Sequence, residues 1–154
     1  MKREKISIRH YLFTALLVWF GNGCLSVFAQ NDFDTYFEKK SLRIDFALSG
    51  DAQQQTAALQ QLREEPVWGG PRKNLIDPFE YGGYCLKVYD QSTGKLIYSR
   101  GFCTLFEEWR TTVQATKETQ SWTNSVSIPY PKKPVVMELL ARDRTDNVFS
   151  PLMT

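Results

Sequence analysis

The sequence predicts a mainly β protein: a single antiparallel β-sandwich, immunoglobulin-like or jelly-roll-like, with one or two short helices. Three observations predict it. Several short segments alternate apolar and polar side chains with the period of two that is typical of half-buried strands. Turn residues separate these segments at regular intervals, as in sandwiches. The length of 154 residues fits one domain.

Residues 1–29 are predicted to be a cleaved secretory signal peptide. Four basic residues lie around the start of this segment, an apolar run follows from Tyr11 to Phe20, and small Ala29 precedes polar Gln30. The run is too short for a membrane span, which needs about 20 apolar residues. We therefore expect residues 30–154 to form one exported domain, in the periplasm, on the outer surface or secreted, without a membrane span.

Lipidation at Cys24 is the alternative to cleavage after Ala29. Removal of residues 1–29 leaves 15 Lys and Arg against 16 Asp and Glu, a net charge of −1. No basic surface then remains for phosphate groups, which argues against a nucleic-acid partner.

The first half of the exported chain contains a strand, a helix and a loop. Leu42, Ile44 and Phe46 alternate with polar or small residues, which predicts a strand. Residues 52–65 are rich in Ala, Gln and Leu, which favours a short helix. Glycine and proline punctuate residues 66–78, so we expect a loop there.

A hairpin is predicted next. Residues 83–89 and 96–105 are its two strands, and residues 90–95 form the turn, with Gly94 in a left-handed conformation. Asp90 paired with Lys95 would place Tyr89 opposite Leu96, and Cys85 opposite Arg100.

The two cysteines of the hairpin, Cys85 and Cys103, have two possible states. An exported protein permits a disulfide between them. The predicted register puts them on opposite faces, so the bond would need a bulge or a bend near Gly101. Two free thiols are the alternative.

The last part of the chain predicts further short strands. In order, we expect a helical turn or irregular segment at 111–119, a strand at 125–128 ended by prolines, a strand at 135–141, a turn at 143–147 and the start of a last strand at 148–149.

An ordered series of motifs runs through the chain from residue 41 onward. The series reads SLRIDF at 41–46, VWGG at 67–70, NLIDP at 74–78, YGGY at 81–84, KVYD at 87–90, LIYSRGF at 96–102, EEWRTT at 107–112 and SVSIPYPKKP at 125–134. It resembles the N-terminal domain of the bacterial IgA-peptidase family, metallopeptidase family M-64, from about Phe33 to about Phe149.

The resemblance implies a non-catalytic module that precedes a zinc peptidase domain, here absent. Peptidases of that kind use an H-E-x-x-H helix, in which two histidines hold zinc and the glutamate activates water. This sequence has no such motif, so no catalytic residue is carried over and no cofactor is expected in this chain. The implied partner is a peptidase catalytic domain, in cis or in trans.

The number of histidines also limits the catalytic chemistry that the chain can perform. His10 is the only histidine, and it leaves with the predicted signal peptide. The exported chain then excludes Ser-His-Asp and Cys-His catalysis, and every zinc site that needs imidazole. We therefore expect no enzyme activity from this chain alone.

Charged motif residues have structural interpretations. Arg100 and Glu108 are predicted to form an ion pair that fixes the strand to the segment after it, since Arg suits a bidentate bond with a carboxylate. Glu107 and Glu108 are neighbours that would point to opposite sides of an extended segment, which argues against a catalytic carboxylate pair.

Trp68, Trp109 and Trp122 are candidate binding aromatics, for a glycan or a host protein, although each is more often a core residue. They motivate the alternative function, a stand-alone exported binding module. Asp143, Asp146 and Asn147 loosely suggest a calcium loop, but their spacing favours a plain turn.

Overall fold

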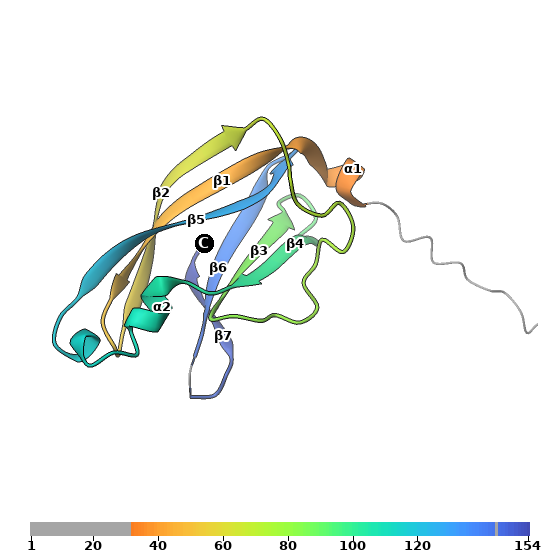
Figure 1. Cartoon of the computed structure of the whole chain (residues 1–154). Helices are drawn as coiled ribbons and strands as arrows, with labels where there is room; N and C mark the ends of the chain where they lie inside the picture. The colour runs from red at the N-terminus through yellow and green to blue at the C-terminus, as the bar shows by residue number, and fades with distance from the viewer. Residues whose placement is uncertain (1–31, 144) are drawn as a thin grey trace, which may run out of the picture. The chain divides into compact units, whose positions relative to one another are not determined.

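The computed structural model describes residues 32–143 and 145–154, whose strands form two antiparallel sheets (Figure 1). The first sheet has the order β2-β1-β5 and the second β4-β3-β6-β7. This confirms the predicted mainly β, antiparallel fold; the predicted signal peptide lies outside the described residues. The elements are α1 (Asp32–Tyr36), β1 (Phe37–Gly50), β2 (Gln55–Glu65), β3 (Tyr84–Asp90), β4 (Leu96–Phe102), α2 (Leu105–Trp109), the 3-10 turn η2 (Gln114–Thr116), β5 (Gln120–Pro131), β6 (Val135–Arg142) and β7 (Phe149–Met153).

Strand β1 is the centre of the first sheet, and its alternating pattern explains its two faces. Ile44, Phe46 and Leu48 face the other sheet and are buried. On the opposite face, Asp45 accepts hydrogen bonds from the Arg43 guanidinium (2.9 and 2.8 Å) and from the Ser125 hydroxyl (2.6 Å). These bonds, that from Arg43 above all, hold the pKa of Asp45 below its ordinary value.

The helix predicted at residues 52–65 is wrong, because this segment is the edge strand β2. It pairs with β1 from Ser41–Glu65 to Gly50–Gln55. Ala, Gln and Leu favour a helix in isolation, but here the backbone hydrogen bonds to β1 outweigh that preference.

The strand predicted at 125–128 is also too short. Strand β5 runs through both Pro129 and Pro131, which lie opposite Ser41 and Phe37 of β1. Proline is tolerated at an edge, where its missing N–H faces away from the neighbouring strand. The strand predicted at 135–141 is confirmed as β6.

The predicted hairpin is confirmed as β3 and β4, with Gly94 at φ 68° in its turn. The carboxylate of Asp90 accepts hydrogen bonds from Ser92 and Thr93, which hold its pKa below its ordinary value. Tyr89 lies opposite Leu96, as expected, but a bulge follows immediately and shifts the remaining pairs by one residue.

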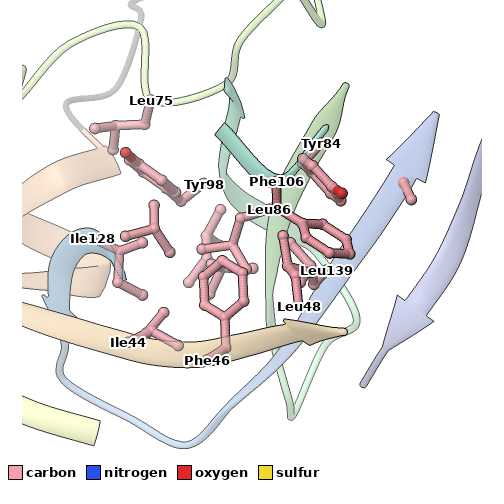
Figure 2. Close-up of a cluster of buried hydrophobic side chains, with 14 of the residues drawn as sticks. Ile44, Phe46, Leu48, Leu75, Tyr84, Leu86, Tyr98, Phe106, Ile128 and Leu139 are labelled. Carbon is pink, nitrogen blue, oxygen red and sulfur yellow. The ribbon is translucent and has the colours of Figure 1, made fainter. Parts of the chain in front are cut away.

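The core fills the space between the two sheets (Figure 2). Figure 2 shows aromatic and aliphatic side chains from both sheets turned toward one another. Loop and helix residues close its ends, with Leu75 from the loop after β2 and Phe106 from α2. The core residues labelled there are Ile44, Phe46, Leu48, Leu75, Tyr84, Leu86, Tyr98, Phe106, Ile128 and Leu139.

Candidate functional site

A groove lies between the loop of residues 66–83 and the edge strand β4. It has a volume of about 830 Å³, and Trp68, Asp77 and Arg100 line it together with other residues of the loop and with Ser41 and Ser127 of the first sheet. The loop also covers part of the strand edge, since Ser99 N–H donates to the Leu75 carbonyl at 3.0 Å. The groove therefore combines an aromatic wall with charged and polar groups.

Asp77 organises this loop. Its Oδ1 accepts hydrogen bonds from the N–H groups of Phe79 (2.9 Å) and Glu80 (3.3 Å), and its Oδ2 accepts one from Gly101 N–H in β4 (3.0 Å). The bond from Phe79 is the largest cause that holds the pKa of Asp77 below its ordinary value, and burial opposes it. One carboxylate thus shapes the loop and fixes it to the sheet.

Two basic residues hold the second half of the loop against the outer face of the second sheet. Lys87 forms an ion pair with Glu80 at 2.8 Å. Arg142 of β6 donates to the carbonyls of Gly82 (3.0 Å) and Glu80. The loop is therefore tied to β3, β4 and β6 together.

An exposed aromatic pair sits on this fixed loop. The rings of Phe79 and Tyr81 stack at 5.5 Å with an interplanar angle of 8°, and the two residues are 69% and 74% exposed. Glu80 between them has φ 49°, a conformation that costs a non-glycine residue energy and that the surrounding contacts must enforce. The sequence offered no signal for this pair beyond the loop composition.

The predicted binding aromatics occupy other environments. Trp68 and Trp109 are buried, and Trp122 is half-buried. Trp68 donates from Nε1 to the Pro71 carbonyl at 3.0 Å and contacts Tyr98 edge-on. Trp109 and Trp122 lie next to each other, 6.4 Å between ring centres, and neither of them lines the groove. The three residues do not form one exposed surface.

The buried side chain of Trp109 carries a polar indole edge. Its Nε1–H has no hydrogen-bond partner in the described part of the chain. The neighbouring Arg110 is also buried, and it donates from Nε to the Asp51 carbonyl at 2.7 Å, which connects α2 to the β1–β2 turn.

The predicted ion pair between Arg100 and Glu108 is not among the ion pairs of residues 32–143 and 145–154. The bulge near Tyr89 places Arg100 opposite Leu86, on the side of β4 that meets the groove, where it hydrogen-bonds Tyr98. The chain then turns at Thr104 into α2, which leaves Glu108 exposed to solvent. The neighbouring carboxylate of Glu107 packs beside Gly83 instead.

Both described cysteines are free thiols. Cys85 is fully buried and Cys103 is exposed, so the disulfide that was one of the two predicted states is not formed. The same bulge explains the position of Cys85, which lies opposite Gly101 rather than Arg100. Burial raises the pKa of the Cys85 thiol, which makes it unreactive while the loop stays closed.

The residues that loosely suggested calcium form a turn. Asn147 N–H donates to the Asp143 carbonyl at 3.1 Å, and Asp146 Oδ1 accepts from Val148 N–H at 2.9 Å. Within residues 32–143 and 145–154, no group of three His, Cys, Asp or Glu side chains is arranged to hold a metal ion. None of the helices there has the length and apolar character that crossing a bilayer requires.

The comparisons with known proteins address the whole fold rather than the groove. The family described as "Peptidase M64 N-terminus" matches residues 32–152. No curated protein matches the chain significantly. The family match begins at the first residue of α1, ends within β7 and confirms the resemblance predicted from the motif series. The chain therefore belongs to the family of M64 peptidase N-terminal domains.

Proposed function

We propose that this chain is a non-catalytic accessory domain that packs against, and assists, the catalytic domain of an M64 peptidase. One observation carries the proposal: the family match covers nearly the whole sandwich, from the first residue of α1 into β7. The family's description places this domain at the N-terminal side of a peptidase, so a peptidase catalytic domain is the natural partner.

The residues of this chain favour a structural role over a catalytic one. A zinc site of the H-E-x-x-H type needs two histidines, and this sequence has only His10. The strongly bound carboxylates also have structural partners. Asp77 fixes a loop, Asp45 connects β1 to Ser125 of the neighbouring strand β5, and Asp90 shapes a turn.

The test mixes the purified chain with a separately produced M64 catalytic domain. We expect a one-to-one complex by analytical ultracentrifugation, and a change in peptidase rate or thermal stability when the complex forms. An unrelated β-sandwich of similar size is the control. Failure to form a complex, with an unchanged rate and stability of the catalytic domain, would contradict the proposal.

A second candidate function is a stand-alone module that binds a glycan or a host protein. The observation that favours it is the exposed, rigidly held pair Phe79 and Tyr81, because aromatic faces held in place lose little entropy on binding. Binding to a glycan or protein panel that disappears in Phe79→Ala/Tyr81→Ala, and persists in the exposed-site control Val113→Ala, would support it. Equal binding by both variants would rule this pair out.

We propose further that the chain is exported. The support is the order of basic segment, apolar run and small residue before Gln30.

A further inference from the structure

The core-facing side of the first sheet is left partly uncovered at its edge strand β2. Leu62 lies opposite Ile44, and Leu59 opposite Phe46, so both leucines share the face that buries these β1 residues. Yet Leu59 and Leu62 remain 50% and 47% exposed, whereas Ile44 and Phe46 are buried. Apolar side chains thus point to the inside of the sandwich, where the described residues leave about half of each leucine uncovered.

A β-bulge is the reason that both leucines face the same way. Residues three apart on a regular strand point to opposite faces. The register of β2 shifts by one residue between Asp45 and Phe46 of β1, which restores Leu59 and Leu62 to one face. The bulge therefore keeps the side chains of Leu59 and Leu62 on the inner side of the sheet, although the described residues do not fully cover them.

The second sheet ends too early to cover this face. Its edge strand next to β2 is β7, which has five residues against eleven in β2. The mismatch leaves an apolar cleft of about 320 Å³ between the sheets. Its lining includes Ile44, Ala57, Leu59, Met137, Leu139 and Met153.

The end of the family's matched region lies at this cleft. The match ends at residue 152, and the next two residues, Met153 and Thr154, line the cleft. In Figure 1 the label of the C-terminus lies beneath the strands of the first sheet. Where a peptidase domain follows this domain in the family, its start would therefore lie close to the cleft.

Eight of the eleven residues of β2 carry no charge, and its three charged residues, Arg63, Glu64 and Glu65, follow Leu62 at the end of the strand. Residues 55–62 read QTAALQQL, and charged residues begin only at Arg63. Interface centres are depleted of charged side chains, whereas surfaces for anions or nucleic acids are not. The composition therefore fits the surface of another folded domain better than a charged ligand.

We propose that the inner face of β2, with Leu59 and Leu62, and the adjoining cleft between β2 and β7 form the surface on which the M64 catalytic domain docks. This inference rests on the proposed accessory function and adds the surface to it. An apolar element of the catalytic domain, close to the start of that domain, enters the open side of the sandwich and covers both leucines.

The test compares two matched double variants of the full chain. Leu59→Ser/Leu62→Ser alters the docking surface, and Leu105→Ser/Val113→Ser alters two exposed apolar residues elsewhere (66% and 72% exposed). The probe is an M64 catalytic domain whose own N-terminal domain has apolar residues at the matching positions. Calorimetry should show about 30-fold weaker binding for the first variant and less than about threefold for the second.

The folding of the variants and the location of the interface are checked independently. Both variants should keep the wild-type far-UV circular dichroism, because the replaced side chains are half-exposed or more. Hydrogen exchange of the wild-type complex should slow in β2 and β7, with β4 unchanged as the internal reference. Protection that appears in β4 or around Phe79 instead would place the interface elsewhere and overturn the inference.

The remaining outcomes separate the two proposals. Wild-type binding that survives Leu59→Ser/Leu62→Ser would refute this surface and leave the accessory function intact. Absence of any wild-type complex would refute the accessory function and this inference with it. A concentration-dependent dimer of the chain that the same variant dissolves would assign the surface to a second copy, which also overturns the inference.

Discussion

Replacement of Asp77 by alanine is expected to release the loop of residues 66–83 from the sheet and to expose the thiol of Cys85. Cys85 and Gly101 lie opposite each other on the outer face of the second sheet. A Cβ on Gly101 would come within 2.0 Å of the Tyr81 carbonyl oxygen, so the loop crosses directly over this face. Loop opening is therefore the local event that uncovers the buried sulfur.

The size of the effect follows from the hydrogen bonds lost. Asp77 accepts two short bonds, from Phe79 N–H (2.9 Å) and Gly101 N–H (3.0 Å), and a longer one from Glu80 (3.3 Å). Each short bond contributes about 1 kcal/mol net, and the long one contributes little. The variant should therefore lower the free energy of loop opening by about 2 kcal/mol, which corresponds to about 30-fold more opening.

The assay is residue-resolved thiol labelling in native buffer, read by mass spectrometry of peptides. Cys85 should react about 30-fold faster in Asp77→Ala when closing outpaces labelling, because the labelled fraction then follows the open population. Exposed Cys103 is the internal control and should react at the wild-type rate. An unchanged Cys85 rate in the variant would refute the role given to Asp77.

The same carboxylate predicts a dependence on pH. The folded protein holds the pKa of Asp77 below its ordinary value of 3.8, so its contribution is fully present above pH 3.8. The contribution is lost as the pH falls through the lower, folded-state pKa. The difference in unfolding free energy between wild type and Asp77→Ala should therefore shrink between pH 6 and pH 2.5, measured by urea unfolding. A difference that stays constant over this range would contradict the assignment.

Two further predictions concern glycines and the N-terminus. Gly101→Ala should destabilise the chain by about 1–3 kcal/mol in urea unfolding and should speed the labelling of Cys85, because the new methyl group meets the Tyr81 carbonyl. Gly69→Ala is the matched control, since the space around Gly69 is open, and it should change neither the stability nor the labelling rate. Equal effects of the two variants would refute the explanation by close approach. The intact mass of the protein recovered after export should correspond to a chain that starts at Gln30, whereas a mass that retains residues 1–29 would contradict signal cleavage.

The alternation of apolar and polar residues, together with the turn residues, was enough to predict the strands that have one buried face. Strands β1 and β3 alternate apolar and polar side chains, and their alternating residues are buried on one face. Strand β2 gave no such signal, because most of its residues are exposed on both faces. Its strand state depends on hydrogen bonds to β1, which local composition does not encode.

The candidate site depended on details that sequence patterns do not reveal. A one-residue bulge next to Tyr89 moved Arg100 to the groove side and placed Cys85 opposite Gly101. Nothing in the composition of the hairpin predicts that bulge. The position of the pair Phe79 and Tyr81 likewise depends on Asp77, Lys87 and Arg142, which fix the loop through contacts that the local sequence does not predict.

The strand order has a consequence for how the chain reaches its fold. Strands β1 and β2, and strands β3 and β4, are neighbours in sequence and can pair early. The first sheet is completed by β5, which pairs with β1 across the distance from Ile44 to Val126, and the second needs β6 and then β7. Such distant pairings carry a large loop-closure entropy and slow folding. A growing chain that has not yet reached residue 120 therefore has two hairpins, β1–β2 and β3–β4, and neither complete sheet, so its core is still open.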